Sequence, residues 1–238
     1  MDRRNAIKSI AVAGAAAALP KFSAAEVGKK SQLKVGLVGC SGRGIGAVEN
    51  MLQAANGSVK IVAIADLFAD RNDLAIKAFE RYAKKFGKDT IDVPTSRRFS
   101  GWDAYKQILG EDIDIIIHAT PPVFRPLHIR EFVKAGKHLF VEKPACVDPV
   151  QCREMLEIAD EADKKGLTII PGIQRRFHAG YQEAIKRMQD GQIGEVLGAQ
   201  AYWLNSRFFI QDNGVLRLQK ARRSGGGQDR ESGGRPGW

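Results

Sequence analysis

The chain has 238 residues, 44% of them hydrophobic and 27% charged, which is enough for one complete domain and part of a second. Its net charge of +10 would suit a nucleic-acid-binding protein, but residues 1–25 contribute +3 and residues 207–238 contribute +4. The long middle of the chain is therefore nearly balanced and has no dense basic stripe. We exclude nucleic acid as the main partner on this ground.

The N-terminal segment has the pattern of an export signal. Arg3-Arg4 precedes a mildly apolar run from Ile10 to Leu19, and small residues follow at Ser23-Ala24-Ala25. We interpret residues 1–25 as a twin-arginine signal peptide, which predicts a periplasmic or other extracytoplasmic protein. The run is too short to cross a bilayer core of about 30 Å, so no stable membrane anchor is expected. An ordinary amphipathic N-terminal helix is the alternative.

The three cysteines, Cys40, Cys146 and Cys152, are odd in number and lack metal-ligand spacing. Cys40 falls in a tight turn where it cannot readily pair. We predict that all three are small buried residues and that the chain has no metal site.

From Leu33 onward, short apolar runs alternate with amphipathic segments. Strands are predicted at 33–38, 59–65, 113–119, 138–141 and 167–170, and helices at 44–55, 69–86, 125–135 and 149–165. Strands buried on both faces and joined by helices indicate a parallel sheet with right-handed crossovers. The predicted fold class is α/β, a doubly wound parallel-sheet Rossmann domain over residues 33–172.

Several details of these helices are also predicted. In the helix at 69–86, the spacing places Leu74, Ala78 and Tyr82 on one face. Asp148 can cap the helix at 149–165, and Gly136 ends the helix before it.

After Pro171-Gly172 the pattern changes. A helix at 178–189 and a long strand at 195–205 predict the start of an incomplete α+β second domain over residues 173–206. Residues 207–238 contain a Ser-Gly-Gly-Gly cluster and scattered arginines without a sustained period, which predicts a disordered tail. A shifted reading frame or a truncated gene would produce such an ending, and a natural glycine-arginine tail is the alternative.

A glycine-rich turn follows the strand at 33–38. Gly39, Gly42 and Gly44 allow the backbone to approach a pyrophosphate, and Ser41 takes the middle glycine position of a G-x-G-x-x-G pattern. The amides at the N-terminus of the following helix favour a phosphate group. We predict that these residues and Arg43 bind a dinucleotide.

Asp66 ends the next apolar strand, about 27 residues after Gly39. A carboxylate at this place accepts from ribose hydroxyls and repels a 2′-phosphate, which favours NAD over NADP. Arg71 nearby keeps NADP possible. The alternative role for Asp66 is to cap the following helix.

Two later strands end in further candidate residues. Thr120-Pro121 follows the strand at 113–119, and His128 lies in the helix beyond, where a partly exposed helix histidine is the alternative. Glu142-Lys143 follows the strand at 138–141. A lysine beside a nicotinamide ring can hold a proton, with its pKa lowered by burial and by the ring's charge. Glu142 would pair with Lys143 or with the ribose, and a surface salt bridge is the alternative.

The motifs G-C-S-G-R-G, A-T-P-P-x-x-R-P-x-H and V-E-K-P, in this order and spacing, resemble the Gfo/Idh/MocA family. That family is named after glucose-fructose oxidoreductase, inositol dehydrogenase and a rhizopine-catabolism protein, and the chain is most similar to its exported branch. The resemblance covers about residues 33–205. It implies a Rossmann domain followed by a mostly antiparallel sheet domain that forms the sugar site and often a homo-oligomer interface.

The resemblance also implies roles for individual residues. Lys143 corresponds to the lysine that assists proton transfer beside the nicotinamide, and Gln174 to a residue that reaches the cofactor. Weaker candidates for substrate contact are Arg175, Arg176, His178 and Tyr181. The family's further catalytic aspartate and histidine have no counterpart between residues 208 and 238. The resemblance therefore supports cofactor binding more strongly than turnover, and it leaves a homo-oligomer doubtful for this chain.

The sequence thus predicts an oxidoreductase that uses NAD, or NADP, on a sugar or cyclic polyol. A tightly bound cofactor would suit an exported enzyme. An NAD-dependent glycosidase of the same superfamily and a non-catalytic, truncated nucleotide-binding product are the alternatives.

Overall fold

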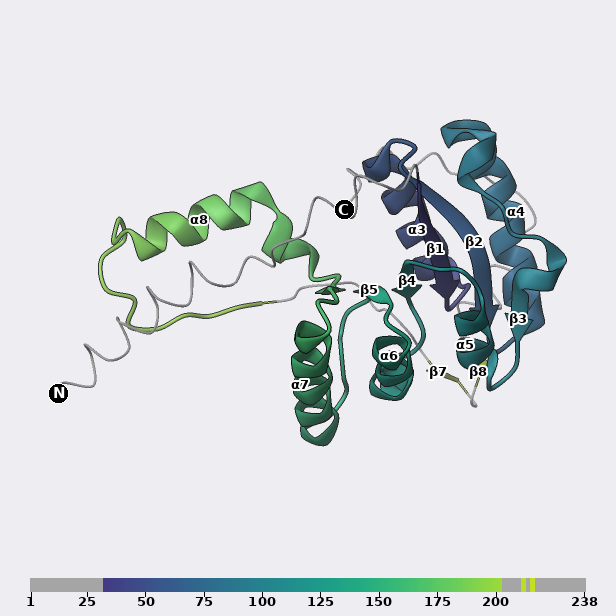
Figure 1. Ribbon diagram of the computed structural model, residues 1–238. Helices are drawn as coiled ribbons and strands as arrows, with labels where there is room; N and C mark the ends of the chain where they lie inside the picture. Colours follow the sequence, from purple (N-terminus) through teal and green to yellow (C-terminus); the bar gives the residue numbers. More distant parts are fainter. Residues whose placement is uncertain (1–31, 203–210, 213–214, 217–238) are drawn as a thin grey trace. The chain divides into compact units, whose positions relative to one another are not determined.

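The structure is a computed structural model that describes residues 32–202, 211–212 and 215–216 (Figure 1). The chain divides into two compact units, Met1–Tyr181 and Gln182–Trp238.

The first unit is built on a six-stranded sheet in which all neighbouring strands are parallel. Its strands are β1 Leu33–Val38, β2 Val59–Asp66, β3 Arg98–Ser100, β4 Ile115–His118, β5 His138–Val141 and β6 Ile169–Pro171. Their spatial order is β3-β2-β1-β4-β5-β6. The predicted α/β doubly wound fold is confirmed. In such a sheet ligands bind beyond the carboxyl ends of the strands where the order reverses, which here is between β1 and β4.

The helices between these strands cover both faces of the sheet. They are α3 Gly42–Ala55, α4 Ala69–Phe86, α5 Ala104–Gln107, α6 Arg125–Lys134 and α7 Pro149–Lys164. The buried residues of α3 and α4 belong to one hydrophobic cluster, and those of α5, α6 and α7 belong to another. Single 3₁₀ turns complete the connections at Lys88–Thr90, Thr95–Arg97, Ile108–Gly110, Pro122–Phe124 and Gln174–Phe177.

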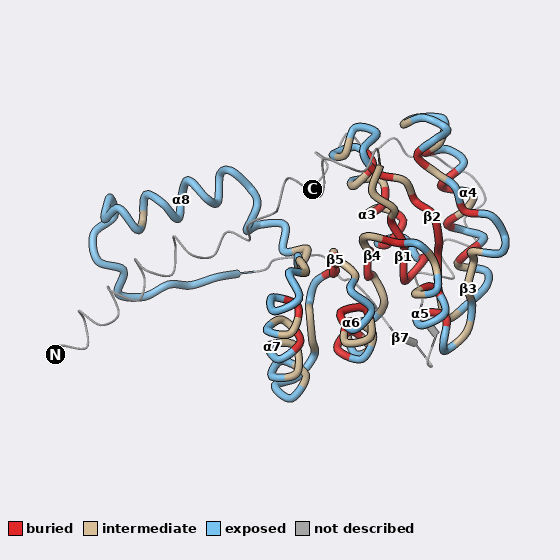
Figure 2. Tube along the Cα trace, in the orientation of Figure 1, coloured by how far each residue is buried: buried red, intermediate tan, exposed pale blue. Residues whose placement is uncertain are grey.

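The central strands supply both clusters, as the buried colouring of β1, β2 and β4 shows (Figure 2). Leu37 of β1 packs with Leu52 of α3 in one cluster, and Val38 packs with Phe132 of α6 in the other. Full burial of a side chain of this size contributes about 1.5–3 kcal/mol. The core therefore fixes the carboxyl edge of the sheet from both sides.

The structure moves some predicted element boundaries. The strand predicted at 113–119 is limited to Ile115–His118, and the one at 167–170 lies at Ile169–Pro171. α3 begins at Gly42, two residues earlier than predicted. β3 and α5 were not predicted, because elements of three and four residues are too short to display a period.

One predicted helix face is wrong in part. In α4 the buried residues are Asn72, Ala75, Ala78, Phe79 and Tyr82, in agreement with the prediction for Ala78 and Tyr82. Leu74 is instead 44% exposed. It precedes Ala75 by one residue, and a rotation of about 100° per residue takes it off the buried face.

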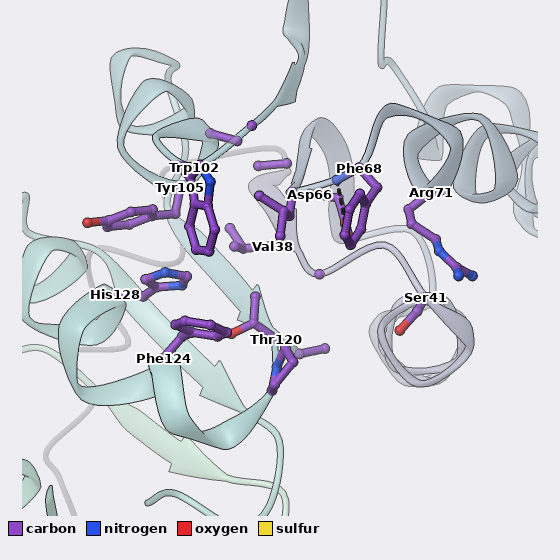
Figure 3. Close-up of a pocket in the computed structure, with 17 residues that line it drawn as sticks. Val38, Ser41, Asp66, Phe68, Arg71, Trp102, Tyr105, Thr120, Phe124 and His128 are labelled. Carbon is purple, nitrogen blue, oxygen red and sulfur yellow. Dashed lines mark hydrogen bonds between the residues drawn. The ribbon is translucent and has the colours of Figure 1, made fainter. Parts of the chain in front are cut away.

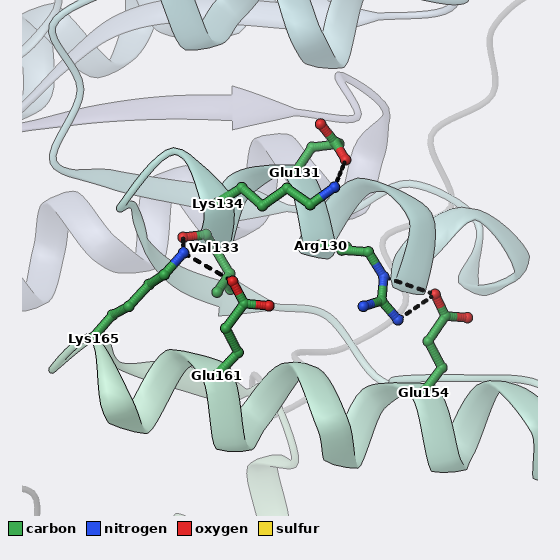
Figure 4. A network of polar contacts seen from close by, with 7 residues as sticks. All are labelled: Arg130, Glu131, Val133, Lys134, Glu154, Glu161 and Lys165. Carbon is green, nitrogen blue, oxygen red and sulfur yellow. Dashed lines mark hydrogen bonds and ion pairs between the residues drawn. The ribbon is translucent and has the colours of Figure 1, made fainter.

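The helix α7 begins as predicted, since Asp148 accepts a hydrogen bond from the amide of Gln151 at 2.8 Å. Gly136 follows α6 with a φ of 71°, also as predicted. Figure 4 shows the polar contacts between α6 and α7, where Arg130 donates to Glu154 and Lys165 donates to the carbonyl of Val133.

The cysteine prediction is confirmed for Cys40, which is buried, but Cys146 is partly exposed and Cys152 is exposed on α7. Among the described residues, no three histidine, cysteine or acidic side chains gather as a metal site requires. In the same part of the chain, no helix has the length and apolar character to cross a bilayer.

The helix predicted at 178–189 is present as α8, Ala179–Gln189. In the second unit the two-residue strands β7, Gln211–Asp212, and β8, Val215–Leu216, form an antiparallel pair. The strand predicted at 195–205 is wrong over 195–202, where no strand forms, and 203–205 lie outside the described residues. A strand needs a hydrogen-bonded neighbour, and an apolar alternation does not supply one. The predicted signal peptide and nearly all of the predicted tail lie outside the described residues.

Candidate functional site

The glycine turn joins β1 to α3 at the point where the strand order reverses. Gly39 has a φ of +99°, and a Cβ there would lie 2.7 Å from the backbone of Ala119 and Thr120. A Cβ on Gly44 would overlap the carbonyl oxygen of Gly39. These two glycines are thus required by the packing of the turn against β4 and α3.

Gly42 differs from them, because a Cβ built on it meets no atom within 4 Å. The helix α3 begins at this residue, and Ser41 at its N-cap makes no side-chain capping hydrogen bond. The first amides of a helix have no intrahelical partner, and their partial positive charge favours an anion. The turn therefore combines open space at Gly42 with amides available to a phosphate group.

Asp66 ends β2 beside this turn. Its Oδ2 accepts from the amide of Cys40 at 2.6 Å, and its Oδ1 accepts from the amide of Phe68 at 3.0 Å. Phe68 is the N-cap residue of α4. Asp66 thus contacts the residue before α4 but does not cap the helix, since α4 has no side-chain capping hydrogen bond. Each carboxylate oxygen has further lone pairs with which to accept from a ligand.

A mostly apolar cavity of about 300 Å³ opens beside Asp66 and the turn (Figure 3). Asp66 and Phe68 lie on one side of it, and Trp102, Phe124 and His128 lie on the other. Six predicted site residues line this cavity: Gly39, Ser41, Asp66, Thr120, Pro121 and His128. The structure thus brings the predicted residues of β1, β2 and β4 together in one place.

Two histidines lie at the aromatic side of the cavity: His128 lines it, and the buried His118 lies behind His128. Nε2 of the buried His118 lies 3.1 Å from Nδ1 of His128 and 2.7 Å from Oγ1 of Thr120, and the His128 ring stacks on Tyr105 with centroids 3.9 Å apart. Burial, together with the nearby charges of His128 and Arg125, lowers the pKa of His118 well below its usual range. Burial also lowers the pKa of His128 to about 4. Both rings are therefore neutral near pH 7.

The residues after β5 depart from the prediction. The carboxylate of Glu142 is buried and accepts from Nε of Arg43 at 2.7 Å, so its partner is this arginine rather than Lys143. Lys143 is exposed, and the predicted burial of its side chain is absent. A strand end places successive side chains on opposite sides, which turns Glu142 inward and Lys143 outward.

Gln174 and the predicted substrate residues are all exposed, and none of them lines the cavity. The segment that carries them starts beside Glu142, since a Cβ on Gly172 would lie 3.4 Å from Oε1 of Glu142. Arg175 donates to the hydroxyl of Tyr181, and the His178 ring lies 5.5 Å from the Tyr181 ring. Three of the four substrate candidates, Arg175, His178 and Tyr181, therefore form a group of their own on the surface of the first unit.

Residues 33–169 match the sequence profile of the Gfo/Idh/MocA oxidoreductase family, NAD-binding Rossmann fold. The chain belongs to this family. The match spans more than half of the chain and contains the glycine turn, Asp66 and the motifs after β4 and β5.

The curated relatives include dehydrogenases and glycosyl hydrolases. Inositol 2-dehydrogenase from Rhizobium meliloti is 30% identical over 69% of this chain and 43% of that protein. A glycosyl hydrolase family 109 protein from a Shewanella species is 26% identical over 86% of this chain and 46% of that protein. The chain thus spans less than half the length of these relatives.

Solved structures agree with the Rossmann fold. A scyllo-inositol dehydrogenase from Lactobacillus casei with bound NAD(H) and scyllo-inositol superposes with a TM-score of 0.52, at 22% identity, over 69% of this chain and 43% of that one. A 3-ketoreductase from Actinomadura kijaniata in complex with TDP-benzene and NADP superposes with a TM-score of 0.51, at 23% identity, over 69% of this chain and 44% of that one.

Several residues of this site were missed by the sequence reasoning: Phe68, Trp102, Tyr105, His118, Phe124 and Arg125. Trp102 and Tyr105 follow β3, a strand too short to predict. For Arg125 a sequence signal did exist, because this residue is the arginine of the A-T-P-P-x-x-R-P-x-H motif that resembles the Gfo/Idh/MocA family. The motif marked Arg125 as a residue of interest, but no local pattern showed which groups its side chain would contact.

Proposed function

We propose that this chain carries the cofactor domain of an NAD(P)-dependent oxidoreductase that acts on a sugar or cyclic polyol. The observation that carries the proposal is the joint position of Asp66 and the glycine turn on one cavity, with Gly42 open beside the start of α3. An apolar cavity with a carboxylate at its edge suits an adenosine, and uncapped helix amides suit a pyrophosphate. The described residues therefore fit the dinucleotide.

Different residues along the carboxyl edge of the sheet would contact different parts of the cofactor and the substrate. Asp66 would accept from the adenosine ribose hydroxyls, which favours NAD over NADP, and the amides of α3 would hold the pyrophosphate. The bound nicotinamide would supply the hydride acceptor or donor. Lys143 would take the proton of the substrate hydroxyl as the alcohol becomes a ketone, and its exposure suits contact with a substrate outside this domain.

A glycosidase is the second candidate, because a glycosyl hydrolase family 109 protein is among the relatives. Such an enzyme would oxidise a sugar hydroxyl, eliminate the aglycone and reduce the product again, without net redox change. The same cofactor residues would serve both reactions. Release of a chromogenic aglycone, without accumulation of NADH, distinguishes it from a dehydrogenase.

The proposal is tested by calorimetric titration of the full chain with NAD and NADP, followed by a screen of inositols and sugars for NADH formation. We expect binding of NAD in preference to NADP. Lys143→Ala should remove any turnover, whereas Lys77→Ala on the exposed face of α4 should not. A monodisperse protein that binds neither nucleotide would contradict the proposal.

We also propose export by the twin-arginine route, on the strength of Arg3-Arg4 and the small residues at 23–25. Replacement of both arginines by lysine should hold the protein in the cytoplasm. Fractionation of cells that express the two forms tests this, and equal export of both would overturn the assignment.

A further inference from the structure

Arg125 is a charged residue in a position that is unfavourable for a charge. It is the first residue of α6, it is 3% exposed, and its Nε has no hydrogen-bond partner among the described residues. A buried cation is costly, and the positive end of a helix dipole adds to the cost. An apolar residue of similar volume would often stabilise such a place better.

The contacts of Arg125 indicate what the charge does. Nη2 donates to the carbonyl of Thr120 at 3.0 Å, and Nη1 donates to the carbonyl of Pro144. Thr120 belongs to the loop after β4, and Pro144 belongs to the loop after β5. One planar guanidinium thus bridges two loops that leave neighbouring strands at the same edge.

The hydrogen bonds of Arg125 hold Pro144, the residue that follows Lys143 in the chain. Pro144 is held by Arg125 on one side of Lys143, and Glu142 is held by Arg43 on the other. Both chain neighbours of the exposed lysine are therefore anchored by arginines. The Glu142 charge also acts on Arg125, where it opposes the lowering of the arginine pKa by burial.

We propose that Arg125 is a positioning residue, which holds the loops after β4 and β5 together so that Lys143 and Thr120 present a fixed surface to the nicotinamide half of the cofactor. The inference rests on the proposed function. Arg125 does not line the cavity beside Asp66, although Thr120, which it holds, does, so its effect should be larger on the nicotinamide half of the cofactor than on the adenosine half.

The test compares the full chain with Arg125→Lys and Arg125→Met. A lysine keeps the charge but cannot hold two carbonyls in fixed geometry, and a methionine keeps much of the volume without donors. Arg130→Lys is the matched control, since Arg130 lies on the same helix and pairs with Glu154 of α7 (Figure 4). Circular dichroism checks folding, and if Arg125→Met does not fold, Arg125→Lys decides alone.

Two measurements are made on each protein. Calorimetric titration with NAD and with ADP-ribose, which lacks nicotinamide, should show a larger loss of affinity for NAD than for ADP-ribose in Arg125→Lys, with NAD affinity about tenfold weaker. Amide hydrogen exchange without ligand should be faster at 119–124 and 141–147 only. Arg130→Lys should match the wild type in both.

The outcomes separate the positioning role from a general structural one. Equal weakening of NAD and ADP-ribose, or faster exchange throughout the sheet, would mean that Arg125 merely stabilises the fold. Unchanged exchange in the two loops would overturn the inference as well. A wild-type chain that binds neither nucleotide would contradict the proposed function, and the exchange measurement would still decide whether Arg125 ties the loops.

Discussion

Oδ2 of Asp66 accepts a hydrogen bond from the amide of Cys40 at 2.6 Å, which links the end of β2 to the glycine turn after β1. Its Oδ1 accepts from the amide of Phe68 at the start of α4. The side chain that is proposed to bind the ribose therefore also holds the glycine turn and the residue that precedes α4. The helix cap that the sequence offered as the alternative role is absent, because α4 has no side-chain capping hydrogen bond.

This double role predicts that Asp66→Asn changes binding and stability together. An asparagine can accept from one of the two amides but presents a donor to the other, so the turn loses a contact. We expect NAD affinity to fall about 10- to 100-fold, and the melting temperature to fall by roughly 2–4 °C for each 1 kcal/mol lost. Asp70→Asn, on an exposed residue four positions along, is the control. Calorimetry and thermal unfolding are the measurements, and wild-type NAD affinity in Asp66→Asn would refute the ribose role.

The glycine turn predicts that two similar substitutions act differently. In Gly44→Ala the new methyl overlaps the carbonyl of Gly39 and must push α3 from β1, which costs about 1–3 kcal/mol. In Gly42→Ala the methyl meets no protein atom within 4 Å, so stability should hold. NAD affinity should nevertheless fall about tenfold or more in Gly42→Ala, because the methyl enters the space beside the helix amides. Urea unfolding and NAD titration separate the two, and an equal stability loss in both variants would contradict this division.

The ion pair of Arg43 with Glu142 predicts that removing the arginine lowers the free energy of unfolding more than neutralising the glutamate does. The Glu142 side chain is 5% exposed and that of Arg43 is 55% exposed. Arg43→Met leaves a buried carboxylate without this partner, whereas Glu142→Gln leaves an arginine that can reach water. We expect Arg43→Met to lower the free energy of unfolding by about 1–2 kcal/mol and Glu142→Gln by less than about 1 kcal/mol. A double-mutant cycle by urea unfolding measures the coupling, and a larger loss in Glu142→Gln would reverse the argument.

The sequence predicted the parts of this fold that depend on local pattern. The strand at Leu33–Val38 and the helix at Ala69–Phe86 have their predicted boundaries, since each has an apolar period long enough to read. Gly39 and Asp66 were found because a tight turn and a strand end restrict which residues can occupy them.

What the sequence did not predict depends on contacts between distant parts of the chain. Arg43 and Glu142 are 99 residues apart, and no local spacing joins them. Trp102 reaches the cavity from a loop after β3, whose three residues gave no signal. The strand predicted at 195–205 failed for the converse reason, because alternation alone does not provide the neighbouring strand that a sheet requires.

The contact between the buried His118 and the partly buried His128 predicts that stability depends on pH. Because burial places the pKa of His128 at about 4 and that of His118 well below its usual range, the unfolded chain binds protons below about pH 6.5 while the folded chain does not. Stability from these groups is therefore complete above about pH 6.5 and is lost as the pH falls toward 4. We expect His128 alone to account for a loss on the order of 2 kcal/mol between pH 7 and pH 5, measured by urea unfolding. His128→Phe, which can still stack on Tyr105, should reduce the loss of unfolding free energy between pH 7 and pH 5, whereas His178→Gln on the exposed surface should not. The same loss of unfolding free energy in His128→Phe as in the wild type would assign the acid sensitivity to other groups.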